Sequence, residues 1–415
     1  MSSKRRPGGK MEKTEASLHS LPSVSHLKKV FTPQQSGRWI VLSIAIGVIS
    51  GFMAGIFFLL LEWCTHHAFE IWVGMPVVVP EGEEIFSHVS AHADSPNRLL
   101  FFLLPIIGGL LSGLLVYTFA PEAEGHGTDA MIRAFHHEKG KIRARVPPIK
   151  AISTILTLAS GGSAGREGPI AQMGAGLGSW LADRLGLSAF ERRIMLLAGT
   201  AAGLGAIFRA PLGGAITAIE VPYKEDFETE AMIPCVIASV FAFAVFSSIF
   251  GFQHIFKIPD FAFRNPVELV FYAILALVCV PTGIFYIRCF EWMRTGLFPS
   301  IPLPRHVKPM LGGLGVAILG LFVPRVYGAG WGQLQLAILG EIGIKTMLFL
   351  GLLKIVATSF TIGSGGSGGV FGPTLFIGGM LGGVVGFLGH RYFPGIVTQP
   401  GAYVLVGMAA FFAGV

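Results

Sequence analysis

The sequence predicts an all-helical protein that crosses a membrane several times. Of its 415 residues, 52% are hydrophobic and only 13% are charged, and the mean hydropathy is +0.65. A soluble domain carries roughly 25% charged residues. A spanning helix needs ~20 residues, and five segments are long enough or apolar enough to span: 39–64, 98–120, 233–251, 267–290 and 347–361. The fold class we expect is therefore an all-α polytopic membrane protein.

The N-terminal 38 residues differ in composition from everything that follows. They hold eight Lys or Arg residues against two Glu, are rich in Ser, Pro and Gly, and contain no apolar core. They also lack a cleavable signal pattern. We therefore expect residues 1–38 to form a disordered, basic, cytoplasmic tail.

The loops between the first spans predict the orientation of the chain. The first loop is acidic and the next is basic, through Glu81, Glu83, Glu84 and Asp94 in the first and Lys139, Lys141, Arg143, Arg145 and Lys150 in the second. Acidic loops outside and basic loops inside give a cytoplasmic N-terminus. We attribute the net charge of +7 to the ends of the spans and expect no nucleic-acid partner. We expect a multi-pass protein of the plasma membrane of a prokaryote.

Several apolar segments look short or are interrupted by Gly and Pro, namely 170–185, 212–221 and 374–388. Two related breaks open such segments: Gly165-Arg166-Glu167-Gly168-Pro169, and Gly369-Val370-Phe371-Gly372-Pro373. Short, interrupted segments at matching places in two halves point to a transporter-type binding site. The two breaks are therefore the first candidates for a functional site.

Comparing the chain with itself reveals an internal repeat. In order, the shared features are GIFFLLLEW and GIFYIRCFEW, two Gly-Gly pairs (108–109 and 312–313), two Gly-x-Gly motifs (125–127 and 330–332), and the two breaks. From Gly-x-Gly to break the spacing is 40 residues in one half and 39 in the other. We therefore expect a first membrane repeat at 39–255 and a second at 265–415. By register, GMAAFFAGV at the end matches the region before Ala210-Pro211, so we expect the second repeat to be incomplete.

The composition of the breaks favours an anion site built from helix starts. Pro suits the first helical position, where no N–H is needed, and Gly leaves backbone N–H groups uncovered. Each helix start then presents free donors and roughly half a positive charge. Weak binding by several dipoles also lets an ion leave again. The alternative is close helix packing, which we favour for scattered pairs such as 108–109 and 382–383, but not for the two breaks.

Glu167 is the ionisable residue of greatest interest, because charge at membrane depth is costly and usually functional. Its carboxylate can occupy the anion site as a tethered competitor. Protonation or a swing of the side chain would then free the site. The alternative is an ion pair with Arg166, but adjacent residues on a helix point apart. Arg166 can instead hold the loop or bias the local field.

These motifs resemble one membrane-protein family closely. GREGP at 165–169, GSGGSGGVFGP at 363–373 and APLGGAITAIE at 210–220 are similar to the CLC family of voltage-gated chloride channels and proton/chloride exchangers. The resemblance runs from about residue 39 to 415. It implies an inverted-topology repeat with broken helices and a homodimer with one anion path in each subunit. Glu167 matches the gating glutamate, and the anion-binding positions are backbone amides near Arg166, Glu167, Gly168, Val370, Phe371 and Gly372.

Three departures from the family pattern qualify this resemblance. Members with GSGIP place a serine hydroxyl at the central site, whereas this chain has His126. Its ring either donates to the anion or turns away into a hydrogen-bonded loop. Exchangers of the family commonly carry a second glutamate at the position where this chain has Val221. The alternative is that Glu225, Asp226 or Glu228 in the nearby loop substitutes for it in this chain. The family's central tyrosine lies beyond the region that this chain reaches, so we expect these 415 residues alone to conduct poorly.

We therefore expect a gated chloride channel with Glu167 as the gate, and a proton-coupled exchanger as the alternative. The expected partners are chloride or a similar small anion, the lipid bilayer and a second subunit, without a further cofactor. An intramembrane enzyme is disfavoured, because no nucleophile or metal set accompanies Glu167. Neighbouring histidines at 66–67 and 136–137 do not share a helix face. Cys64, Cys235, Cys279 and Cys289 lack metal-ligand spacing, so we expect them to serve packing.

Overall fold

The computed structural model describes residues 33–86, 96–223, 226–263 and 265–415. Most of the tail expected at 1–38 therefore lies outside the described residues. The first helix begins at Pro33, six residues before the span predicted from position 39. In the described part of the chain the secondary structure is helical, apart from an isolated antiparallel bridge between Gly165 and Gly369.

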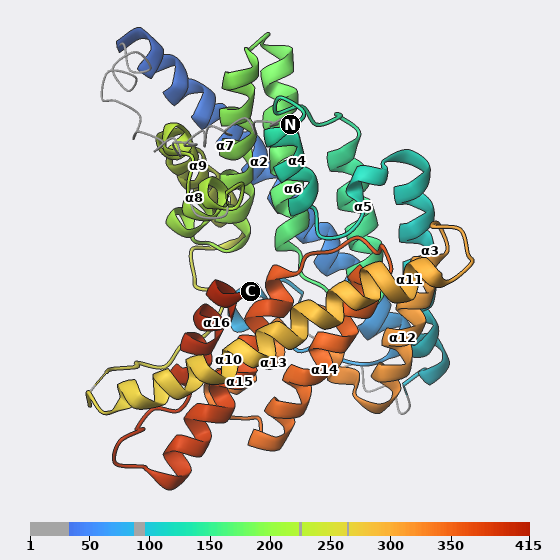
Figure 1. Cartoon of the computed structure of the whole chain (residues 1–415), viewed down its shortest axis with the longest axis vertical. Coiled ribbons are helices and arrows are strands. Elements are labelled where there is room, and N and C mark those ends of the chain that lie inside the picture. The colour runs from blue at the N-terminus through green and yellow to red at the C-terminus, as the bar shows by residue number, and fades with distance from the viewer. Residues whose placement is uncertain (1–32, 87–95, 224–225, 264) are drawn as a thin grey trace, which may run out of the picture.

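Eight helices make up the first half of the described chain (Figure 1). Their bounds are Pro33–Thr65 (α2), Arg98–Phe119 (α3), Thr128–His136 (α4), Val146–Ala159 (α5), Glu167–Arg184 (α6), Ala189–Ile207 (α7), Pro211–Glu220 (α8) and Met232–Phe250 (α9). The second half contains Glu268–Glu291 (α10), Phe298–Ser300 (α11), Lys308–Phe322 (α12), Trp331–Leu339 (α13), Ile344–Gly363 (α14), Phe371–Tyr392 (α15) and Ala402–Gly414 (α16).

The helices repeat in the order that the sequence motifs predict. The first helix of each half continues into a π-helical segment, His66–Val73 after α2 and Trp292–Leu297 after α10. Nine-residue helices, α4 and α13, then occupy matching places, and each follows a short 3₁₀ turn. The internal repeat is therefore present in the structure as well as in the sequence.

Equivalent helices of the two halves run in opposite directions. A methyl group added at Gly109 of α3 would lie 2.3 Å from the Pro309 carbonyl oxygen, and one at Gly313 of α12 would lie 2.0 Å from that of Pro105. Positions rise along α3 as they fall along α12, so the two helices are antiparallel. The packing role expected for these glycine pairs is confirmed, and the repeat is inverted.

Six described helices are long and apolar enough to cross a membrane. Five of them include the predicted spans. The sixth is α15, which has 22 residues, so the prediction of a short or broken segment at 374–388 is wrong. Its glycines face close neighbours instead of ending the helix: Gly378 packs on Gly407 and Gly382 on Tyr403. By contrast, α8 is short, as predicted, with 10 residues, whereas α6 has 18.

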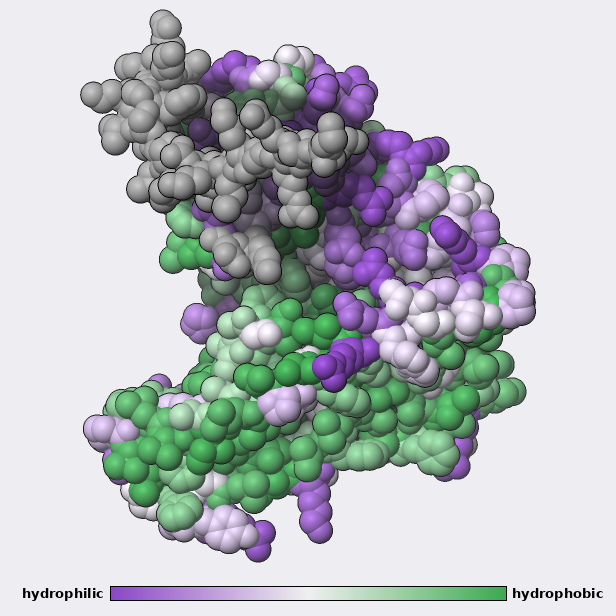
Figure 2. All heavy atoms as spheres, viewed as in Figure 1, coloured by the Kyte–Doolittle hydropathy of each residue, from purple (hydrophilic) through white to green (hydrophobic). Residues whose placement is uncertain are grey.

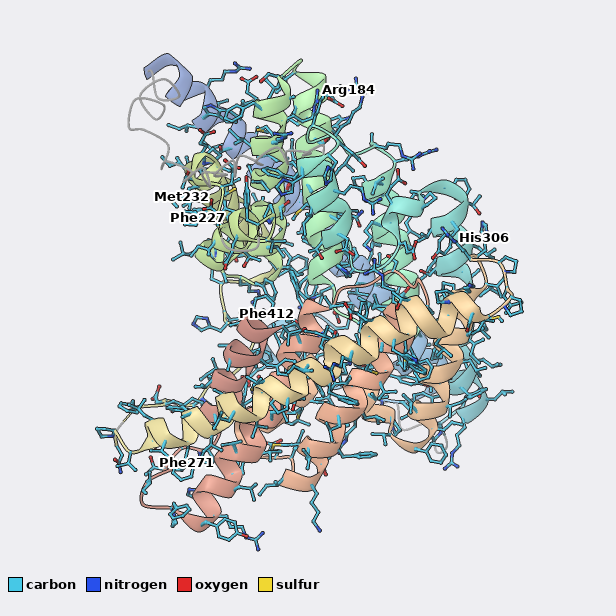
Figure 3. All side chains as sticks on the ribbon, viewed as in Figure 1. Arg184, Phe227, Met232, Phe271, His306 and Phe412 are labelled. Carbon is cyan, nitrogen blue, oxygen red and sulfur yellow. The ribbon has the colours of Figure 1, made fainter. Side chains whose placement is uncertain are left out.

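Apolar side chains cover the outside of the second half. Figure 2 shows a broad hydrophobic surface over α10 and its neighbours, whereas polar residues gather toward the end of the molecule that carries Arg184 in Figure 3. On α10 the side chain of Leu277 is 73% exposed. A largely unburied apolar helix of this length suits contact with lipid.

Candidate functional site

The two breaks meet at the centre of the molecule. The Gly165 amide donates to the Gly369 carbonyl at 2.7 Å, and the Gly369 amide donates back to Gly165 at 2.6 Å. Immediately beyond this pair, α6 begins at Glu167 and α15 begins at Phe371. Neither helix start has a side-chain cap, so their first amides are not satisfied by a capping residue. Two positive helix ends therefore face one small region.

The Glu167 carboxylate spans the gap between these helix starts. The side chain is buried, and its Oε2 atom accepts a hydrogen bond from the Gly372 amide of α15 at 3.0 Å. Its Oε1 atom has no hydrogen-bond partner among the described residues. The carboxylate thus pairs with an amide in the uncapped first turn of α15. A methyl group at Gly165 would lie 2.2 Å from Oε2, so only glycine leaves room for this arrangement.

The Arg166 side chain points away from Glu167, toward two other acids. Its guanidinium contacts the Glu83 carboxylate and lies 3.6 Å from a Glu62 oxygen. The same group stacks over the Phe58 ring at 4.8 Å. The alternative role of Arg166 as the ion-pair partner of Glu167 is therefore not realised. At the other break, the Phe371 ring packs edge-on at 5.4 Å against Phe412, which Figure 3 labels on α16.

The turn at 125–127 lies against both breaks. The carbonyl of Gly125 accepts from the Gly368 amide at 3.2 Å. The carbonyl of His126 lies so close to α6 that a methyl group at Gly168 would be 2.4 Å from it. Gly127 has φ of 89°, which favours glycine. The backbone of the sequence-predicted turn is thus brought to the site.

The His126 ring is held within its own loop. Nδ1 contacts the Thr128 hydroxyl, and Nε2 lies 3.2 Å from Asp129 Oδ2. Of the two orientations expected, the described structure has the ring in the hydrogen-bonded loop. The Asp129 carboxylate also accepts from the Arg294 guanidinium at 3.0 Å. The His126 hydrogen bond outweighs burial and, with Arg294, holds the pKa of Asp129 well below its usual range.

Two buried lysines hold matching turns of the two repeats, and the sequence analysis missed them in this role. Lys150 of α5 donates to the carbonyls of Ala123 and Gly125 at 3.0 and 2.6 Å. Lys354 of α14 donates to those of Val326 and Gly328, at 3.2 and 2.5 Å. Each lysine precedes its break by 15 residues. The available signal was this shared spacing, because a lysine inside an apolar segment needs a partner.

At the position where exchangers of the family commonly carry a second glutamate, this chain has an apolar residue. Val221 caps the C-terminus of α8 and is partly buried. Glu220 and Asp226 are exposed, and Glu228 accepts from the Tyr223 hydroxyl at 2.5 Å. Glu225 lies outside the described residues.

The minor motifs have ordinary structural surroundings. His136 Nε2 contacts the Pro222 carbonyl at 2.7 Å, and in the part of the chain that the structure describes no group of three metal-ligating side chains occurs. The four cysteines are free thiols, two buried and two partly buried. Packing, as predicted, accounts for their positions.

A family described as voltage gated chloride channel matches residues 108–415. The chain belongs to this CLC family. A ClcB-like protein of Ralstonia nicotianae is 31% identical over 75% of this chain and 73% of its own length. The H(+)/Cl(-) exchange transporter ClcA of Cronobacter sakazakii is 30% identical, over 90% of this chain and 78% of its own.

Solved structures of CLC proteins share the fold. The crystal structure of a slow cyanobacterial Cl⁻/H⁺ antiporter superposes with a TM-score of 0.75 at 26% identity. The match covers 91% of this chain and 85% of that one. This CLC protein is accordingly an integral, multi-pass chloride transport protein, and the family and inverted-repeat fold expected from the motifs are confirmed.

Proposed function

We propose that this CLC protein conducts chloride through the meeting point of its two breaks, with Glu167 as the gate. The observation that carries the proposal is the 3.0 Å hydrogen bond from the Gly372 amide to the Glu167 carboxylate. That carboxylate takes the place of an anion at the α15 helix start. When it is protonated or displaced, the amide becomes free for chloride.

The anion-binding groups we propose are backbone amides near Arg166, Glu167, Gly168, Val370, Phe371 and Gly372. Their position at two uncapped helix starts supports this set. We assign His126 a supporting place in the neighbouring turn, where its carbonyl oxygen lies beside α6 and both ring nitrogens already have protein partners. The domains that we propose are a first repeat at 39–255 and a second at 265–415. We also propose that the protein forms a homodimer with cytoplasmic N-termini and uses no further cofactor.

We infer passive conduction because of Val221. Tight coupling to protons needs a titratable group on the far side of the gate, and valine provides none. The second candidate is proton/chloride exchange, which the ClcA relative and the cyanobacterial antiporter favour.

One experiment separates the two modes. The full-length protein is purified and reconstituted in liposomes, a chloride gradient is applied, and chloride and pH are recorded together. Passive conduction predicts chloride flux without stoichiometric proton movement. Proton uptake in a fixed ratio to chloride would replace the channel with the exchanger.

The gate itself is tested by Glu167→Ala. Without the carboxylate, the Gly372 amide is always available, so chloride flux persists and loses its pH dependence. The flux is measured from about pH 5 to pH 8, and size-exclusion chromatography checks the fold. A variant that folds but carries no flux, or that keeps the wild-type pH profile, would refute the gate.

A further inference from the structure

Arg166, the residue directly before the proposed gate, lies in a buried cluster of acids. Its side chain is 4% exposed, that of Glu83 is 5% exposed and that of Glu62 is 19% exposed. Glu83 comes from the loop between α2 and α3, and Glu62 from the end of α2. The guanidinium also lies over the Phe58 ring at 4.8 Å.

Two acids share the Arg166 guanidinium, and Arg209 interacts electrostatically with Glu83 and Arg166. Glu83 makes the close contact with Arg166, whereas Glu62 stands at 3.6 Å and is more exposed. Two carboxylates that share one cation do not retain charge equally, and the weaker-held one takes up a proton more readily. Glu62 is therefore the member of the cluster whose charge responds to protons.

Glu62 also has access to solvent. It lines a cavity of about 600 Å³, together with Phe69, Phe101 and Trp331. The other ionisable groups around the cluster, taken from each element that packs there, are His66 and Glu70 after α2, Arg209 after α7 and Arg325 before α13. His66 and Glu70 pair at 3.0 Å. None of these groups lies between Glu62 and Arg166 in the described contacts.

We propose that Glu62 is a positioning residue that sets the proton dependence of the Glu167 gate through Arg166. The proposal rests on the gate function inferred above and adds a second titratable group to it. With Glu62 ionised, its negative charge offsets part of the field of Arg166 at Glu167, so the ionised form of Glu167 is less favoured. With Glu62 neutral, the field of Arg166 is less compensated and favours the ionised, blocking form of the gate.

Removing the charge of Glu62 should lower the pH midpoint of chloride flux. Glu62→Gln removes one negative charge permanently and keeps the shape of the side chain. The ionised form of Glu167 is then favoured, so the gate opens only at more acidic pH. We expect the pH midpoint of chloride flux to fall by on the order of half a pH unit or more.

The experiment compares pH profiles of chloride efflux from liposomes with the same pH on both sides. Wild type, Glu62→Gln and Glu62→Asp are measured, and Glu62→Asp restores the wild-type midpoint because it keeps the charge. The matched control is Glu81→Gln in the same loop, whose carboxylate pairs with Lys257 at 3.1 Å and is 60% exposed. Its midpoint stays at the wild-type value.

The gate variant separates failure of this inference from failure of the proposed function. In the Glu167→Ala background, adding Glu62→Gln shifts nothing, because the group that Glu62 influences is gone. A pH-insensitive Glu167→Ala together with an unshifted Glu62→Gln midpoint would overturn the role of Glu62 alone. A pH-dependent Glu167→Ala would instead overturn the gate. Wild type gives a further check that needs no variant: its profile is shallower than a one-proton titration, and a slope of one would contradict the inference.

Discussion

At the scale of single residues, the surroundings of His126 could be predicted only in part from the sequence. Thr128 and Asp129, which hold its two ring nitrogens, follow it within three residues in the sequence. Arg294, which completes the link to Asp129 at 3.0 Å, is 165 residues away. Sequence distance gave no reason to join them, so both ring orientations remained open until the chain was folded. The link ties the turn beside α6 to the segment after α10.

The depressed pKa of Asp129 makes this link testable by pH. The fold favours the ionised carboxylate, so its contribution to stability is fully present above the ordinary pKa of about 3.9 and is lost as pH falls below it. Asp129→Asn should lower the unfolding temperature at neutral pH, by an amount that shrinks below about pH 4. Thermal unfolding in detergent measures this, with the exposed Asp260→Asn as control. A difference that already fades between pH 7 and pH 5 would contradict the assignment.

At the scale of elements, glycine has two structural roles, and the sequence distinguishes them only in part. At Gly165 and Gly369 it opens the backbone at a break, and this use was predicted from the adjoining Gly-Pro. Within α6 and α15 it allows another helix to approach, which is why α15 continues where a break was expected. A packing glycine and a helix-breaking glycine look alike in sequence, because the difference lies in whether a neighbouring helix covers the position.

The packing of α6 on α7 gives the prediction at this scale. A methyl group at Gly174 would lie 2.1 Å from the Gly199 carbonyl oxygen, and the second repeat has the same contact at 2.3 Å between Gly378 and Gly407. Both neighbours are backbone and cannot rotate away. Gly174→Ala and Gly378→Ala should each destabilise the fold by about 1–3 kcal/mol. Unfolding temperatures in detergent are compared with Gly395→Ala, where no atom lies within 4 Å. Equal behaviour of all three variants would show that these contacts are looser than described.

At the scale of the whole molecule, much of the architecture was accessible from the sequence. Self-comparison identified the two repeats, and the shared breaks located the site between them. Their opposite directions were implied by the family resemblance and appear in the structure through the antiparallel seam of α3 and α12. The polar contacts across the repeats were not predicted, because Ser and Thr are common in membrane helices. Examples are Thr154 with Ser367 at 3.0 Å and the Ser163 amide with the Thr361 hydroxyl at 3.0 Å.

The α3–α12 seam should behave as one cooperative unit joining the repeats. Gly109 and Gly313 both lie on it, 2.3 and 2.0 Å from carbonyl oxygens of the opposite helix when a methyl group is added. Once Gly313→Ala has pushed the helices apart, Gly109→Ala meets less resistance, so the double variant should be more stable than the sum of the single effects predicts.

Gly174 belongs to a different interface, between α6 and α7, and provides the matched comparison. Combined with Gly313→Ala, Gly174→Ala should act additively within about 0.5 kcal/mol, because the two sites share no partner. Double-mutant cycles of unfolding free energy in detergent measure both pairs. If the effects of Gly109→Ala and Gly313→Ala on the unfolding free energy simply added, α3 and α12 would be shown to adjust independently at each contact. The seam would then not behave as one cooperative unit.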